Sequence, residues 1–291
     1  MQAEGGEDLP PRGTPTERQR RLGSELRKMR IAADMTTEFA AGLLGVPRTN
    51  VPNMESGRSG ISPDRVRTLA GNYGRADSPL VDALAAMAAE RGTHWWEKYR
   101  GQLPVGFLDI AEMEWHARRL RIALTTHLPG LLHTEDHARA VFEQVIPRLP
   151  MSDVDTRVAH RLDRRQVFSK PDAPTVDLIL HEAALRMQFG GPGVARQQLE
   201  HILGMADQHD ITVRVVPFAA GGFPGAGQSV IYAENVVPTL DTVELDSTHG
   251  PEFIDSEIQL HKYRAQLDAM QDVALTPALS RDFIRTIADE L

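Results

Sequence analysis

The chain has 291 residues, of which 41% are hydrophobic and 25% are charged, and its net charge is −8. This length suits about two globular domains with a sizeable core. The sequence has no cysteine, which excludes disulfides, cysteine-ligated zinc and thiol catalysis. No apolar run approaches the roughly 20 residues that span a bilayer, so we expect no membrane partner.

The charge is unevenly distributed along the chain. Residues 12–75 carry 12 Lys/Arg and 6 Asp/Glu, whereas the residues from 76 onward carry 20 basic and 31 acidic side chains. A basic head on an acidic body is typical of a DNA-binding module with a separate effector domain. Chance unevenness and an arginine-rich first helix would give the same numbers. Residues 1–16, acidic and then rich in Pro and Gly, predict a disordered tail and no signal peptide.

Residues 17–91 predict an all-helical head of five helices. Leu22, Leu26 and Met29 recur at helical spacing on the first helix. Thr36 can cap the second helix, and Gly45 provides a sharp turn before the third, which we place at residues 47–56. Further helix signals are the stop at Gly57, the cap-then-proline pair Ser62 and Pro63, and Ser78 with Pro79 before a fifth helix at residues 80–91.

The remaining chain alternates helix and strand signals, which predicts an α+β body at residues 107–291. Residues 92–106, with Trp95 and Trp96, are expected to form a connector. Helices are predicted at residues 107–126, 134–146, 152–168, 182–188, 193–208, 251–270 and 277–291, with Thr134 as a cap. Strands are predicted at residues 175–180, 211–217, 228–233 and 239–246.

The head resembles the xenobiotic-response-element family of helix-turn-helix repressors, which includes phage Cro and lambda repressor. The matching residues are Leu22-Gly23, Leu26-Arg27, Met35-Thr36, Ala41, Leu44-Gly45-Val46, Glu55-Ser56-Gly57-Arg58, Ser62-Pro63, Val66, Leu69-Ala70 and Tyr73-Gly74. The resemblance implies that the third helix reads DNA in the major groove and that the second helix lies near phosphate. The DNA-contacting residues would be Thr36, Thr37, Arg48, Thr49, Asn50, Asn53 and Arg58.

The third helix departs from the family pattern. Asn50 and Asn53 stand at positions that are usually cationic, and Pro52 stands at a position that is usually serine. Fewer cations mean weaker phosphate contacts. A proline in a helix interior costs about 3 kcal/mol. Asparagine can still read adenine, and Arg48 and Arg58 remain. The head therefore either retains DNA binding or is kept for dimerisation or stability.

The body resembles the actinobacterial C-terminal domain of unknown function that follows such heads in antitoxin-like regulators. The matching residues are Trp95-Trp96, Glu114, Leu128-Pro129-Gly130-Leu131-Leu132, Thr134, Ala138-Arg139-Ala140, Arg161-Leu162-Asp163-Arg164-Arg165-Gln166, Glu182-Ala183-Ala184-Leu185-Arg186, Gln198-Leu199 and Val213 to Phe218. The resemblance implies a cytoplasmic, dimeric regulator, often encoded beside a small partner protein.

Three histidines replace the residues usual in this domain, namely His133, His137 and His181. Histidine titrates near neutral pH, so all three are candidate catalytic residues for proton transfer. His133 and His137 are four residues apart, and on a helix they would share a face that suits two metal ligands. The alternative is that all three are structural or surface residues. His133 precedes the capping Thr134 and is then not helical.

Three glutamates, Glu114, Glu182 and Glu244, are candidates for one polar ligand pocket together with His133 and His137. Read singly, each glutamate is a solvated or capping carboxylate, so only their proximity in the fold would support the pocket. The sequence predicts no cofactor, since it has no Walker loop and no G-x-S-x-G elbow.

These signals predict a mainly α protein with an α+β C-terminal domain, acting as a DNA-binding transcriptional regulator. Its partners would be double-stranded DNA, a second copy in a homodimer, and a small molecule or small protein sensed by the body. One alternative is a repurposed scaffold whose C-terminal pocket binds or transforms a small molecule through histidine chemistry. Another is an antitoxin-like interaction protein.

Overall fold

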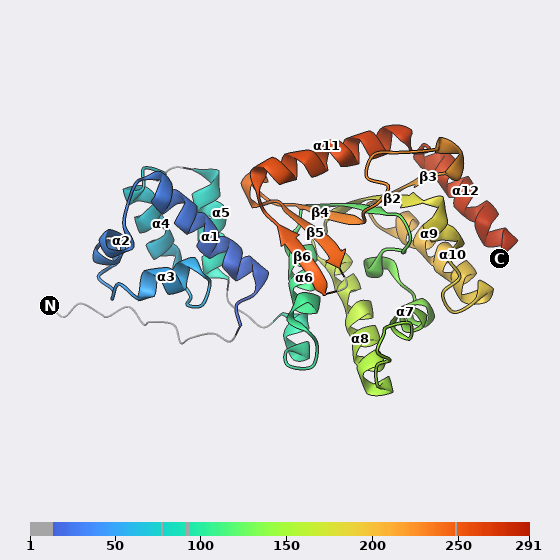
Figure 1. Cartoon of the computed structure of the whole chain (residues 1–291), viewed down its shortest axis with the longest axis horizontal. Coiled ribbons are helices and arrows are strands. Elements are labelled where there is room, and N and C mark those ends of the chain that lie inside the picture. The colour runs from blue at the N-terminus through green and yellow to red at the C-terminus, as the bar shows by residue number, and fades with distance from the viewer. Residues whose placement is uncertain (1–13, 77, 91–93, 248) are drawn as a thin grey trace. The chain divides into compact units, whose positions relative to one another are not determined.

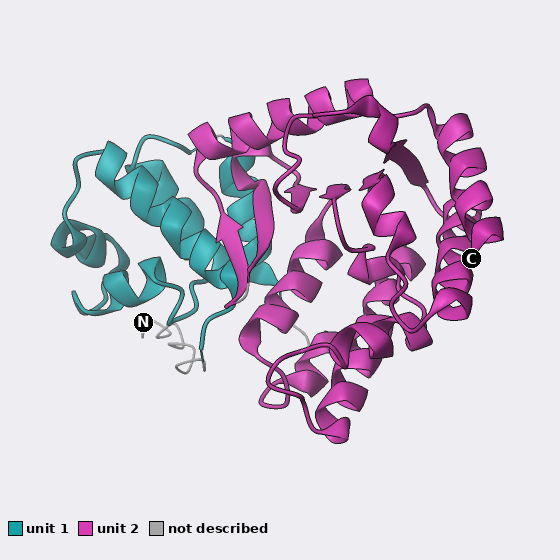
Figure 2. Cartoon of the chain, turned by 45° about the vertical axis from the view of Figure 1, so that its right-hand side comes forward, with its two compact units in different colours: residues 1–93 teal, residues 94–291 magenta. Residues whose placement is uncertain are grey.

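The computed structural model describes residues 14–76, 78–90, 94–247 and 249–291, and divides the chain into compact units at residues 1–93 and 94–291 (Figure 2). Most of the predicted tail lies outside the described residues. Trp95 and Trp96, which we expected in a connector, lie in a 3-10 helix of the second unit. No helix among the described residues is long and apolar enough to cross a membrane.

The first unit is all-helical, as predicted. Its helices are α1 (Glu17–Ala32), α2 (Thr37–Leu44), α3 (Asn50–Glu55), α4 (Pro63–Asn72) and α5 (Pro79–Ala89) (Figure 1). The predicted caps are confirmed: the hydroxyl of Thr36 accepts the Phe39 amide at 3.1 Å, and that of Ser62 accepts the Arg65 amide at 3.3 Å. Gly45 ends α2 at φ 63°, a left-handed conformation that glycine adopts without strain. Local signals therefore set the ends of α2 and the start of α4.

Contacts between α1 and α3 hold the head together. Leu26 and Met29 of α1 are buried, as are Val51 and Met54 of α3. Gly23 lets the two backbones approach closely, since a Cβ there would lie 2.5 Å from the carbonyl oxygens of Met54 and Glu55. The guanidinium of Arg30 donates to both carboxylate oxygens of Glu55, at 2.6 and 2.9 Å. The tertiary contacts thus fix α3 from one side.

The second unit is built on a six-stranded mixed sheet with the order β3-β2-β1-β4-β5-β6. Strands β1, β2 and β3 are parallel, and β4, β5 and β6 are antiparallel to their neighbours. The strands are β1 (Arg119–Leu124), β2 (Thr175–His181), β3 (Ile211–Val216), β4 (Val230–Glu234), β5 (Thr242–Ser247) and β6 (Gly250–Ile254).

Helices cover both faces of this sheet. The α-helices are α6 (Val105–His116), α7 (Glu135–Phe142), α8 (Met151–Asp163), α9 (Glu182–Arg186), α10 (Pro192–Gln208), α11 (Glu257–Val273) and α12 (Pro277–Glu290). The 3-10 helices are η1 (Trp95–Tyr99), η2 (Gly130–Leu132), η3 (Arg164–Ser169), η4 (Phe218–Ala220) and η5 (Pro238–Leu240). The larger core joins one face of the sheet to α9, α10 and α12, and α11 covers the other face (Figure 1).

Two strands were predicted as helix. The first is β1, whose residues we placed in a long helix at 107–126. It lies between β2 and β4 and is buried along almost its whole length, although its first four residues, Arg119 to Ile122, alternate polar and apolar side chains. The second is β6, which we placed at the start of a helix at 251–270; it contains Pro251 and lies at the sheet edge. The α+β class itself is confirmed.

Candidate DNA-reading helix and buried charged cluster

The outer side of α3 carries the candidate DNA contacts of the head. Arg48 and Thr49 are exposed just before the helix, and Asn50 and Asn53 are partly exposed on it. Arg58, after the helix, is also exposed. These residues lie on the segment whose Val51 and Met54 side chains are buried against the head. The predicted DNA-contacting side chains of this segment are therefore accessible to solvent between residues 48 and 58.

Helix α3 begins later than predicted, so Pro52 does not lie in the helix interior, where we expected it to be destabilising. We expected the helix at residues 47–56, with Pro52 in its interior. It spans Asn50–Glu55, after a turn at residues 48 and 49. Pro52 is thus the third helical residue, in the first turn, where amides have no intrahelical acceptor. Its carbonyl accepts the Ser56 amide at 3.0 Å. The proline is compatible with the helix, contrary to our expectation.

The N-terminus of α2 supplies the remaining predicted contacts. Thr36 is exposed and Thr37 is partly exposed. The Thr36 hydroxyl is the cap of α2. Phe39, one turn into α2, is 53% exposed, although it is a large apolar side chain. The predicted phosphate-facing end of α2 is therefore open to a partner.

In the second unit, four charged side chains and one imidazole form a group, here named the charged cluster: Glu114, Arg161, Arg164, Glu244 and His133. All are buried except Arg161, which is partly exposed. Glu114 comes from α6, Arg161 from α8, Arg164 from η3 and Glu244 from β5. Arg164 donates to both carboxylate oxygens of Glu114, at 2.8 and 2.5 Å, and both side chains are buried. The fold thus gathers residues more than a hundred positions apart.

The segment that carries His133 is positioned by α10. The side chain of Gln198, fully buried on α10, accepts the Thr134 amide at 2.7 Å and donates to the Leu132 carbonyl at 2.8 Å. Gly130 then packs against the two arginines, since a Cβ there would lie 2.4 Å from Arg161 and 3.0 Å from Arg164. The absence of a side chain at Gly130 lets both guanidiniums reach this place.

His133 is held as a neutral imidazole. Its Nε2 donates to the Leu128 carbonyl at 3.0 Å, which leaves Nδ1 to accept from Arg161 at 3.3 Å. Burial, and then the Arg161 cation, hold the pKa of His133 well below its usual value. A histidine with both ring nitrogens engaged and a depressed pKa orients its arginine neighbour rather than exchanging protons at neutral pH.

Of the other predicted histidines, His137 lies beside His133 and His181 lies elsewhere. His133 precedes α7 and is not helical, so the two do not share a helix face; their ring centroids nevertheless lie 4.7 Å apart. Burial, and then Arg161, lower the pKa of His137 to about 4. His181 instead caps α9 and contacts Phe218 and Phe223.

The three glutamates predicted for one pocket are not all in one place. Glu114 and Glu244 both belong to the charged cluster. Glu182 does not: its carboxylate accepts from Arg186 at 2.7 Å and from the Phe218 amide at 2.8 Å. Sequence reasoning identified Arg161 and Arg164 only as family motif residues, because no local spacing rule predicts the contact of Arg164 with Glu114.

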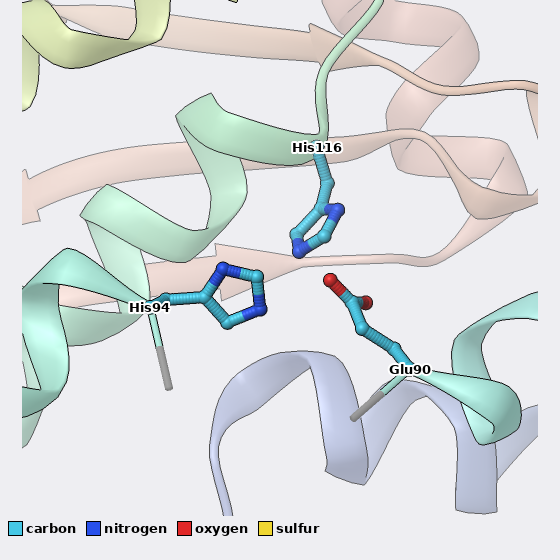
Figure 3. A group of neighbouring side chains, drawn as sticks. All are labelled: Glu90, His94 and His116. Carbon is cyan, nitrogen blue, oxygen red and sulfur yellow. The ribbon is translucent and has the colours of Figure 1, made fainter. Parts of the chain in front are cut away.

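A separate imidazole pair lies near the start of the second unit. His94 stacks on Trp96 with ring centroids 4.4 Å apart. The ring centroids of His94 and His116 are 5.8 Å apart, with the rings edge to face; Figure 3 shows both side chains. Glu90, also labelled in that view, belongs to the first unit, where it pairs with Arg18 at 3.4 Å. The predicted ligand pocket did not include these histidines.

The geometry defines a class: a helix-turn-helix head, and a body with a mixed sheet and a buried charged cluster. Residues 21–84 match the family described as a Helix-turn-helix domain, and residues 107–286 match the family described as a Domain of unknown function (DUF5753). The second match spans more than half of the chain, so the chain belongs to the DUF5753 family. No curated protein and no solved structure matches the chain. The helix-turn-helix domain supports a DNA-binding regulator.

Proposed function

We propose that the chain is a repressor-like transcriptional regulator of the xenobiotic-response-element type that reads DNA through α3. The observation that carries this proposal is the unequal burial of the two sides of α3. Val51, Met54 and the Arg30–Glu55 ion pair anchor one side, while Arg48, Thr49 and Asn53 remain accessible on the other. A helix held in this way can dock in the major groove without refolding.

The proposed division of roles follows the usual order of DNA recognition. Arg48 contacts phosphate, Arg58 contacts phosphate or guanine, and Asn50 and Asn53 contact adenine edges. Thr36 and Thr37 lie near phosphate at the positive end of α2. Because α3 has six residues, one copy offers few base contacts. We therefore propose that two copies bind adjacent half-sites as a homodimer in the cytoplasm.

The test is binding of the full-length protein to a duplex from the region upstream of its own reading frame. Fluorescence anisotropy at several salt concentrations should show binding that weakens steeply with salt. A scrambled duplex of equal length measures the non-specific part, and light scattering of the complex gives the number of copies bound. If the protein at micromolar concentration shows no salt-sensitive binding to the duplex, the proposal is wrong.

We also propose that the second unit senses a small molecule. The supporting observation is the charged cluster, in which the Nε of Arg161 is buried and has no hydrogen-bond partner among the described residues. The histidine-based alternative, in which the body transforms a substrate, draws less support. His133 has both nitrogens engaged and His181 contacts other residues, so the three candidates do not form one site.

A further inference from the structure

Two guanidiniums of the charged cluster meet at Gly130. Arg161 lies near the end of α8, and Arg164, one turn later, begins η3. A Cβ placed on Gly130 would lie within 3.0 Å of the Nη1 atoms of both arginines. The two positive charges therefore lie against the same point of the backbone, where they repel each other unless a negative charge accompanies each of them.

Only Arg164 has such a partner among the described residues. Its Nε and Nη2 donate to the two carboxylate oxygens of Glu114 at 2.8 and 2.5 Å. Arg161 instead donates from Nη1 to the neutral ring of His133 at 3.3 Å, and it forms no ion pair within 4.0 Å in the described part of the chain. One of the two positive charges is therefore matched and the other is not.

The Nε–Nη2 edge of Arg161 has no acceptor in the described part of the chain. Its Nε is buried without a hydrogen-bond partner there, and its Nη2 donates no hydrogen bond to the described residues. Along this edge a planar guanidinium offers two parallel N–H donors, which match the two oxygens of a carboxylate. Arg164 holds Glu114 with the same edge, so the fold shows one turn away how Arg161 can hold a carboxylate.

The surroundings of Arg161 fix its guanidinium and still leave it accessible. The guanidinium carbon lies 4.8 Å from the centre of the Phe142 ring, and Nη1 is bonded to His133. The side chain as a whole is only partly buried, so a small molecule can approach it from solvent. A donor that is held in place before binding loses less conformational entropy when a ligand arrives.

We propose that the second unit binds a small organic acid whose carboxylate accepts two hydrogen bonds from the Nε–Nη2 edge of Arg161. This inference rests on the proposed sensing role of the second unit and names the class of its ligand. Gly130 and His133 are the positioning residues of the site, the first because it leaves space for the guanidinium and the second because it bonds to Nη1.

The charges at the site favour a monocarboxylate over a phosphate dianion. Glu114 neutralises Arg164 and His133 is neutral, so Arg161 supplies one unmatched positive charge. Burial, and then the Arg164 guanidinium, lower the pKa of Arg161 to about 9, which leaves it cationic at pH 7. One negative charge offsets this cation, whereas the second charge of a dianion would meet the carboxylate of Glu114.

The experiment is calorimetric titration of the full-length protein at pH 7 with acetate, butyrate, benzoate and phenylacetate, each beside its primary amide. The amide keeps the shape of the acid and removes its charge. We expect at least one carboxylate to bind with a Kd below about 1 mM, and its amide and inorganic phosphate to bind at least about tenfold more weakly. Arg161→Gln should weaken binding of that carboxylate by about tenfold or more.

Arg161→Lys tests the two-donor edge separately from the charge. It keeps the cation but loses the parallel N–H groups, and it should weaken binding by about fivefold or more. Arg148→Gln is the matched control, because Arg148 is an exposed arginine of the same unit; its affinity should equal that of the wild type. Thermal unfolding checks that each variant folds, and Arg161→Lys carries the test if Arg161→Gln does not fold.

The inference is overturned if no carboxylate binds at about 10 mM, if the amide or phosphate binds as tightly, or if the Arg161 variants keep wild-type affinity. Amides or phosphate that bind without the carboxylates would refute the carboxylate site and leave the sensing role standing. A carboxylate that binds the wild type and the Arg161 variants equally would do the same. DNA binding is measured separately, so its loss alone refutes only the regulator proposal.

Discussion

Arg164 and Glu114 form a two-pronged ion pair between η3 and α6, with both side chains almost completely removed from solvent. Burying two charges is unfavourable unless each satisfies the other, and this geometry does so. The pair therefore ties α6 to the segment that follows α8.

Removing one partner of this pair should destabilise the protein strongly. We expect Glu114→Ala to lower the free energy of unfolding by about 3–5 kcal/mol, because it leaves the buried guanidinium without a counter-charge. Urea unfolding measures the effect. The control is Asp155→Ala, which breaks the exposed pair with Arg139 and should cost at most about 1 kcal/mol. Similar losses in the two variants would contradict the assignment.

Two glycines of the head should respond oppositely to alanine. In Gly23→Ala the new Cβ would lie 2.5 Å from two carbonyl oxygens of α3, so we expect a loss of about 1–3 kcal/mol or more. Gly42 on α2 has nothing within 4 Å of such a Cβ, and Gly42→Ala should be neutral or stabilise by up to about 1 kcal/mol. Thermal unfolding of the two variants tests the α1–α3 contact, and equal midpoints would refute it.

The corrected place of Pro52 makes a further prediction for the stability of α3. Because Pro52 lies in the first helical turn, Pro52→Ala should change the free energy of unfolding by less than about 1 kcal/mol. A gain of about 3 kcal/mol, measured by urea unfolding, would instead indicate that the proline strains a helix interior.

Arg48→Ala should weaken binding to the specific and the scrambled duplex alike. Loss of one phosphate contact should reduce the slope of log K against log salt by about 1. Asn53→Ala should instead reduce the preference for the specific duplex over the scrambled one, since it removes a base contact. Arg285→Ala, an exposed charge on α12, is the control for net charge. If it matched Arg48→Ala in both affinity and slope, α3 would not be the contact surface.

The stability of the protein should fall below pH 6.5 partly because of His160. This residue is 1% exposed among Trp95, Tyr99 and Phe107, and neither ring nitrogen has a hydrogen-bond partner among the described residues. Burial, and then Arg164, lower its pKa to about 3. The unfolded chain therefore binds the proton first, and stability falls as pH drops from 6.5 toward 3.

His160→Phe should remove this contribution. Between pH 7 and pH 5 the variant should lose about 2 kcal/mol less stability than the wild type, as measured by urea unfolding at the two pH values. The exposed His261 supplies the control, since His261→Gln should leave the pH dependence unchanged. A variant that loses as much stability as the wild type would show that His160 does not stay neutral in the fold.

The elements with local signals could be predicted from the sequence. Thr36, Ser62 and Thr134 cap the helices at which we placed them, because a cap depends on residues within one turn. The predicted start of α3 was three residues too early, and this error placed Pro52 in the helix interior instead of the first turn. Strand β1 was missed altogether, since a strand buried on both faces is defined by neighbours that the local sequence does not contain.

The sequence by itself determined the two parts of this protein: a helical head with its turn glycine, and an α+β body with three unusual histidines. The tertiary structure alone decided how the polar residues are grouped. It paired Glu114 of α6 with Arg164 of η3, left Glu182 and His181 with other partners, and gave His133 the role of holding an arginine. The physical reason is that buried charges find their partners through the packing of distant elements, which no local spacing in the chain encodes.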